Sequence, residues 1–185
     1  MIDGMERVPY VHTLTRDELA CAALVAEIRN KLNDGSSNLA AGEHMTKKEL
    51  FENDENAVRA EIACARLLNL AWTGCGPQDA DVGGFVEVRS VTNRGYSLTV
   101  NAKEIATKRG QPFALLLVDG ARCEFMGWEF METVVDYGRC MNPGPKAYHL
   151  LGQERLRHME ELVAYADSWR WHRGLSSLDT QEREL

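Results

Sequence analysis

The chain has 185 residues, of which 44% are hydrophobic and 26% are charged, a composition that excludes disordered, collagen-like and coiled-coil chains. Its apolar run at residues 113–118, like every other apolar run in the sequence, is far shorter than the roughly 20 residues that a membrane span needs, and its N-terminus lacks a signal-peptide pattern. The 21 basic and 28 acidic residues give a formal net charge of −7, which disfavours broad, non-specific binding to nucleic acid.

Cysteine usage points to a reducing compartment. The chain has five cysteines, an odd number, and no two of them form a C-x-x-C pair. Disulfide scaffolds and zinc ribbons need close, paired spacing, so this pattern favours reduced thiols. We therefore expect a cytoplasmic protein with no membrane partner.

The first part of the chain is expected to be helical. Residues 15–32 carry an apolar stripe at helical spacing, and Thr15 with Glu18 forms a capping-box pattern at their start. Small and polar residues at 33–42 indicate a loop. A second helix is expected from about residue 48 or 54 to residue 70.

After the second helix the spacing of apolar residues changes from the helical one to the alternation that is typical of β-strands. The predicted strands are residues 85–90, 96–100, 112–118 and 122–128, the last two joined at an Asp119-Gly120 hairpin signal. We expect all four in one mixed sheet. The second helix and a short helical connection at residues 102–109 should pack on that sheet.

The remaining segments are predicted to be a short helix at residues 129–137, a break at 142–146 and a final helix at 153–171. The order of elements predicts the α/β class, with a single mixed β-sheet flanked by helices in one domain over residues 1–175. The core is expected at about residues 48–172, with the N-terminal helix at 15–33 added to it. Residues 176–185 are expected to form a flexible tail.

Glu61 is an acid in an unusual position. It lies on the same arc of the second helix as apolar residues such as Ile62 and Leu68, so its carboxylate faces the core or a cleft. Burying an unpaired carboxylate costs several kcal/mol. Glu61 therefore either pairs with a nearby arginine, Arg59 or Arg66, or serves a function.

Asp81 and Glu87 flank a double glycine, and the turn between them decides whether they meet. On one straight strand they lie about 20 Å apart. A two-residue turn at Gly83-Gly84 places them on opposite faces, whereas a three-residue turn over residues 83–85 sets Asp81 directly across from Glu87. The alternative is an exposed strand face on which Glu87 and Arg89 are ordinary surface residues.

Converging carboxylates at this turn would favour Mg²⁺ or Mn²⁺, which take oxygen ligands at about 2.1 Å and complete their coordination with water. Arg89 would then lie beside the metal, where its charge can stabilise a phosphate. This combination indicates metal-assisted hydrolysis of a phosphodiester bond.

The motif-bearing segments are AEIA at 60–63, DVGG at 81–84, EVR at 87–89, the strand at 113–118, FMGWE at 125–129 and AY at 147–148. Their order, an acid-bearing helix, a D-x5-E-V-R hairpin, then strand, helix and strand, resembles the PD-(D/E)XK nuclease superfamily with its restriction-endonuclease-like fold. More closely, the set is similar to a group of small phage-encoded proteins. The resemblance covers roughly residues 50–165.

The resemblance implies roles for four residues. In the superfamily the motif acids bind a divalent metal, and a following Lys positions the attacking water. Carried over, Asp81 and Glu87 would be metal ligands, and Glu61 would be a further ligand or an acid behind them. Arg89 stands where the Lys is expected; because arginine stays charged and cannot act as a base, it would hold a phosphate or orient water.

The resemblance also implies a partner and a reaction. It places Lys103, Lys108 and Arg109 where phosphate approaches in this fold; a solvated turn is the alternative. The implied function is that of a Mg²⁺- or Mn²⁺-dependent nuclease of DNA or RNA, with DNA favoured, phage-encoded and in the cytoplasm of a bacterial host. The alternative is a catalytically weak or inactive protein of this fold that binds nucleic acid or a host protein, and a homodimer is open in either case. The Arg89 departure and the net charge favour the alternative, and the position of Glu61 favours the nuclease.

Overall fold

The computed structural model describes residues 9–32, 46–72, 74, 80–142 and 147–172. The helices are α1 (Arg16–Leu32), α2 (Lys47–Leu68), α3 (Ala102–Thr107), α4 (Met131–Tyr137) and α5 (Met159–His172), with a 3-10 turn η1 (Gln153–Arg155) before α5. The strands are β1 (Val11–Thr13), β2 (Glu87–Val91), β3 (Leu98–Asn101), β4 (Pro112–Asp119), β5 (Arg122–Phe130), β6 (Arg139–Met141) and β7 (Tyr148–Leu151). Of the helices in these residues, none combines the length and the apolar character that a membrane crossing requires.

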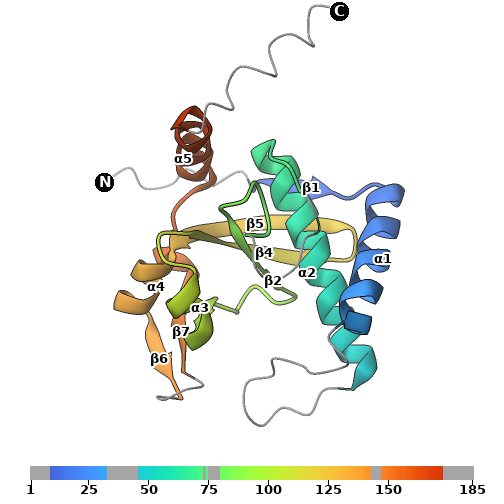
Figure 1. Ribbon diagram of the computed structural model, residues 1–185, viewed down its shortest axis with the longest axis horizontal. Helices are drawn as coiled ribbons and strands as arrows, with labels where there is room; N and C mark the ends of the chain where they lie inside the picture. The colour runs from blue at the N-terminus through green and yellow to red at the C-terminus, as the bar shows by residue number, and fades with distance from the viewer. Residues whose placement is uncertain (1–8, 33–45, 73, 75–79, 143–146, 173–185) are drawn as a thin grey trace, which may run out of the picture.

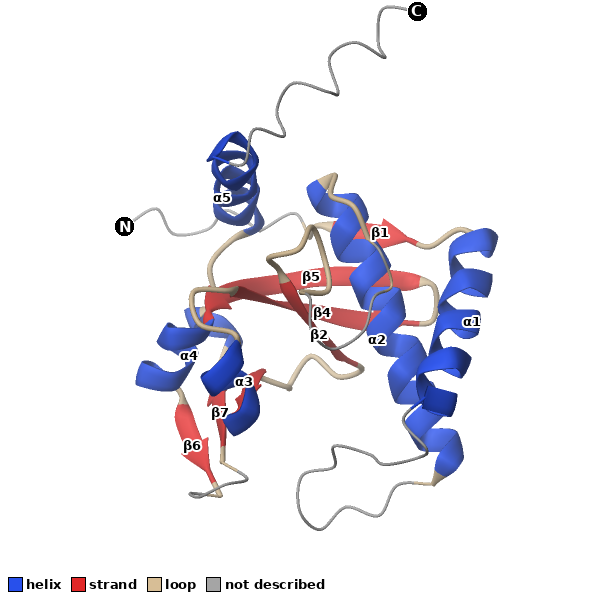
Figure 2. Cartoon of the chain, viewed as in Figure 1, coloured by secondary structure: helices blue, strands red, loops and turns tan. Residues whose placement is uncertain are grey.

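The strands form two sheets (Figure 2). In the first the order is β1-β5-β4-β2; β2 runs parallel to β4, and the other pairs are antiparallel, so the sheet is mixed. The second sheet, β3-β7-β6, is antiparallel. The α/β class and the mixed sheet are confirmed, but the expectation of a single sheet is wrong. The segment at 96–100 was expected in the mixed sheet, and its strand β3 pairs with β7 instead.

β2 is the edge strand of the mixed sheet, and side chains bind part of its free edge. The N–H of Val88 donates to Oδ2 of Asp81 at 2.7 Å, and the C=O of Val88 accepts a hydrogen bond of 3.0 Å from Arg89. At Val88 the main-chain groups are therefore satisfied without a further strand. After Val91 the chain continues into β3, which pairs with β7 in the second sheet.

The two sheets share a core through β4, whose residues alternate between two apolar clusters. Ala114 and Leu116 lie in the cluster that includes α2 and α5, whereas Phe113 and Leu115 lie in the cluster that includes β3, α4 and β7. Residues 112–118 are all buried, as expected of a strand covered on both faces. Figure 1 shows the result: α1 and α2 lie together at one end of the mixed sheet, and α3, α4 and the second sheet lie at the other.

Several other local predictions are confirmed. The N–H of Glu18 donates to Oγ1 of Thr15 and the N–H of Thr15 donates to the Glu18 carboxylate, which is the predicted capping box. Asp119 pairs with Arg122 across a two-residue loop, which is the predicted hairpin. The predicted loop at 33–42 and tail at 176–185 lie outside the described residues.

The last helix starts later than expected, at Met159 rather than residue 153. The preceding residues pair with β5 instead, because Arg157 and Trp128 exchange main-chain hydrogen bonds of 2.8 and 3.2 Å. Gly127 permits this approach, since a Cβ there would lie only 2.5 Å from the Cβ of Leu156.

Candidate active site

The turn before β2 has the three-residue form. Val82 and Val86 exchange two main-chain hydrogen bonds of 3.0 Å, which leaves residues 83–85 as the loop. Its two glycines have φ values of 61° and 74°, in the left-handed region that glycine adopts without strain. The register that pairs Val82 with Val86 sets Asp81 across from Glu87, so of the alternatives that the sequence left open, the structure has the three-residue turn.

Tertiary contacts hold this turn on both sides. Val82 also forms a bridge with Trp72, which follows α2. The ring of Phe85, in the loop itself, stacks on Trp169 of α5 at a centroid distance of 4.3 Å. The turn is therefore tied to the end of α2 and to α5.

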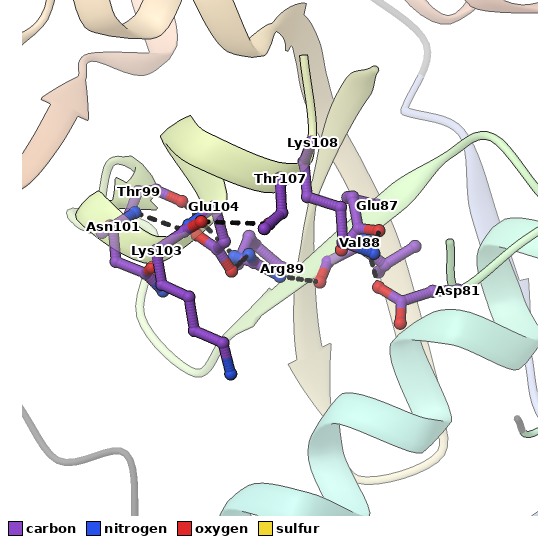
Figure 3. Close-up of polar contacts among 10 residues, drawn as sticks. All are labelled: Asp81, Glu87, Val88, Arg89, Thr99, Asn101, Lys103, Glu104, Thr107 and Lys108. Carbon is purple, nitrogen blue, oxygen red and sulfur yellow. Dashed lines mark hydrogen bonds and ion pairs between the residues drawn. The ribbon is translucent and has the colours of Figure 1, made fainter. Parts of the chain in front are cut away.

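Asp81 lies in a poorly solvated place near two other acids. Burial, followed by the charges of Glu61 and Glu87, raises the pKa of Asp81 to about 7. The hydrogen bond from the Val88 N–H and the charge of Arg89 lower it by less. Figure 3 shows the Asp81 carboxylate against the main chain of β2 at Val88. The charges of the other two predicted acids thus act on the pKa of Asp81.

Glu87 is buried, with 5% of its surface exposed, and its carboxylate binds Lys108. The Lys108 Nζ lies 2.7 Å from Oε1 of Glu87, and only 12% of the lysine side chain is exposed. Lys108 follows the last residue of α3, so this short helix carries the cation to the start of β2 (Figure 3). Lys103 and Arg109, the other two predicted phosphate contacts, are exposed, and the Lys103 side chain points away from Glu87.

Glu61 forms a buried ion pair with an arginine of α1. Arg29 donates to both carboxylate oxygens at 2.8 Å, and the indole Nε1 of Trp72 donates to Oε2 at 2.9 Å. The expectation that Glu61 pairs with an arginine is confirmed, but the two arginines named for it, Arg59 and Arg66, are wrong: the partner is Arg29. Both oxygens of Glu61 are thus engaged by the protein.

Arg89 joins the two sheets. Its Nε donates to the C=O of Thr99 in β3 at 3.3 Å, and its terminal nitrogens donate to the C=O of Val88 and to the carboxylate of Glu104 in α3. The guanidinium carbon also lies 5.0 Å from the centroid of the Phe113 ring. These contacts hold β2 against β3 and α3.

Sequence reasoning missed Arg29 and Trp72 as partners of Glu61. Arg29 lies outside the segment that carries the resemblance, and 32 residues separate it from Glu61. One signal was available: at helical spacing Arg29 shares a face of α1 with the buried residues Ala22 and Ala26. A cation on the buried face of one helix and an acid on that of another indicate a pair.

The structure therefore sets Asp81 across from Glu87 in the turn, pairs Glu87 with Lys108, and places Glu61 near enough to act on the pKa of Asp81 while Glu61 is in its own ion pair. Among the residues that the structure describes, no three His, Cys, Asp or Glu side chains are grouped to hold a metal ion. Asp81 and Glu87 remain as two oxygen donors beside a lysine. Comparisons with protein-family models, curated proteins and solved structures find no match to this chain.

The Arg29–Glu61 pair should be a large contributor to stability. Replacing Arg29 with Met leaves a buried carboxylate without its cation, which should lower the free energy of unfolding by about 3 kcal/mol in urea denaturation. Replacing Glu61 with Met as well should recover most of the loss. Lys31→Met is the matched control, because its pair with Glu27 is exposed to solvent and its loss should leave the free energy of unfolding nearly unchanged. Equal small losses in Arg29→Met and Lys31→Met would contradict this role.

Asp81 should make the protein less stable as the pH rises. The folded state holds the Asp81 proton to about pH 7, whereas the unfolded chain releases it near 3.8, so raising the pH from 5 to 8 favours unfolding. Metal-free wild type should lose about 3 kcal/mol of unfolding free energy over this range relative to Asp81→Asn.

The comparison between these two proteins isolates Asp81. Burial alone would raise the pKa of Glu18, but hydrogen bonds from Thr15 and Arg66 lower it to about 2. The contribution of Glu18 to the free energy of unfolding therefore changes only below about pH 4.5, outside the range compared. Parallel stability curves for wild type and Asp81→Asn between pH 5 and 8 would show that Asp81 titrates normally.

Proposed function

We propose that this chain is a divalent-metal-dependent nuclease, built on a restriction-endonuclease-like core, that hydrolyses phosphodiester bonds of nucleic acid. The observation that carries the proposal is the three-residue turn that sets Asp81 across from Glu87, with Lys108 2.7 Å from the Glu87 carboxylate. Two acids and a cation held together at a strand start are the residue types that metal-assisted phosphodiester hydrolysis uses.

Asp81 and Glu87 suit a hydrated Mg²⁺ or Mn²⁺ ion. Magnesium in proteins is commonly held by one or two carboxylates, with water in the remaining positions. The raised pKa of Asp81 reflects excess negative charge in a poorly solvated place, which a divalent cation would offset. Glu61 does not fit this ligand set, because Arg29 and Trp72 engage both of its oxygens. When bound, the ion would lower the pKa of a water molecule and neutralise charge on the phosphate.

Lys108 takes the part that the resemblance gave to Arg89. The guanidinium of Arg89 is bonded to Thr99, Val88 and Glu104, so its role is to hold β2, β3 and α3 in place. The ammonium of Lys108 is next to Glu87 and would hold a phosphate oxygen or orient the attacking water. Lysine, unlike arginine, can also lose its proton in a poorly solvated site.

A second candidate function is binding without catalysis, to nucleic acid or to another protein. It is favoured by the internal neutralisation of the acids, since Glu61 pairs with Arg29 and Glu87 with Lys108. A site whose acids are already paired gains less from a metal than one whose acids repel freely. The two functions differ in one outcome, cleavage.

The test is a cleavage assay on single-stranded, duplex and branched nucleic acids with Mg²⁺, Mn²⁺ or EDTA. Wild type should cleave with either metal and not with EDTA. Asp81→Asn, Glu87→Gln and Lys108→Met should each reduce the rate by about 100-fold or more, because each removes a group at the reacting phosphate. Lys103→Met is the matched control on α3: because the exposed Lys103 side chain points away from Glu87, we take the solvated-turn alternative for it and expect the wild-type rate.

Circular dichroism of each variant separates loss of catalysis from loss of fold. Wild type that binds nucleic acid but cleaves none with either metal would favour the second candidate. Equal rates for Lys108→Met and Lys103→Met would remove Lys108 from the reaction.

A further inference from the structure

Two exposed tyrosines lie on either side of the η1 turn. Tyr96 and Tyr137 are 57% and 63% exposed, among the most exposed large side chains in the described part of the protein. Gln153 of η1 donates to the C=O of Tyr96 at 2.6 Å, and Arg155 of the same turn donates to the C=O of Tyr137 at 3.0 Å. One short turn thus fixes the main chain of both tyrosines.

Positive charge accompanies these rings. The guanidinium of Arg155 lies 5.7 Å from the centroid of the Tyr137 ring. Gln153 also donates to the C=O of Arg94, two residues before Tyr96, which ties that arginine to the same turn. We call Arg94, Tyr96, Tyr137 and Arg155 the tyrosine–arginine surface.

The arginines of this surface keep part of their charge available. Arg94 shares the buried Glu124 with Arg122, at 2.6 and 2.7 Å, and the two arginine side chains are 59% and 42% exposed. Two cations on one carboxylate leave one net positive charge in that cluster, whereas the exposed Asp136 adds a negative charge next to Tyr137 in the chain. Arg155 bonds a carbonyl and a ring and forms no ion pair with a described residue, although the exposed Glu154 is its neighbour in the chain.

We propose that the tyrosine–arginine surface binds single-stranded nucleic acid. Exposed aromatic rings stack on unpaired bases, which a duplex does not offer because its bases stack on one another, and arginines neutralise the phosphates between them. The large exposed aliphatic side chains of the described residues, which would suit a protein partner, lie away from this surface: Leu24, Ile28 and Leu32 are on α1 and Val163 is on α5. This inference rests on the proposed function for the partner, nucleic acid. It adds that the nucleic acid is single-stranded.

The test is fluorescence anisotropy with a labelled oligothymidylate in EDTA, so that binding is measured without cleavage. Wild type should bind the single strand more tightly than a duplex of equal length. Tyr96→Ala and Tyr137→Ala should each weaken binding about tenfold, the loss expected for one stacked base. Tyr96→Phe and Tyr137→Phe should bind as wild type, because the ring is kept. Tyr10→Ala is the matched control and should bind as wild type. Tyr10 is also exposed, at 40%, but it lies outside the tyrosine–arginine surface and its hydroxyl donates to Glu160 of α5.

Salt dependence tests the charge. In Arg155→Gln the slope of log affinity against log salt should become shallower by about 0.7, the change for one phosphate contact to a single strand. Glu154→Gln should bind more tightly than wild type. An unchanged slope in Arg155→Gln would exclude its phosphate contact.

Other outcomes separate this inference from the nuclease proposal. Three outcomes would overturn the proposed role of this surface, whether or not the protein cleaves: equal binding of duplex and single strand, no binding of either, or unchanged affinity in both alanine variants. Tyrosine-dependent binding by a protein that does not cleave would support the role of the surface and overturn the proposed nuclease function.

Discussion

Buried carboxylates determine how this chain is assembled. Four glutamates in the described residues are only 4–5% exposed, and each has a cation from a distant segment. The pairs are Glu61 with Arg29, Glu87 with Lys108, Glu124 with Arg94, and Glu129 with Arg157. Because a buried carboxylate without a cation is strongly destabilising, these pairs constrain the positions of α1, α3, the β2–β3 connection and the segment before α5 relative to α2 and the mixed sheet.

Asp81 does not follow this rule. Within the described parts of the chain it forms no ion pair, and its carboxylate accepts the N–H of Val88 instead. The three-residue turn keeps it near Glu87, and α2 brings Glu61 close enough to act on its pKa. The same hydrogen bond satisfies the N–H of Val88 at the free edge of β2, the edge strand of the mixed sheet. One aspartate thus connects the architecture to the proposed chemistry.

Local patterns in the sequence were sufficient for the presence of the main helices, the buried strand β4 and the hairpin after it, because neighbouring residues decide each of these. They left the form of the turn over residues 83–85 open. The second sheet was missed, because β6 and β7 have only three and four residues and show no clear period.

The sequence named the acids of the candidate site, and the resemblance named Lys108 as a phosphate contact. It did not predict that Lys108 binds Glu87 or that Arg29 binds Glu61. These partners lie 21 and 32 residues apart in the chain, so only the tertiary fold brings each pair into contact.

The most direct test of this account is the titration of the Asp81 carboxyl carbon by NMR in the metal-free protein. The structure predicts a pKa of about 7 in wild type, and a lower one in Glu87→Gln, because that substitution removes a negative charge facing Asp81. An Asp81 carboxyl that titrates near its ordinary value of 3.8 in wild type, or identically in both proteins, would show that the two acids do not share a site.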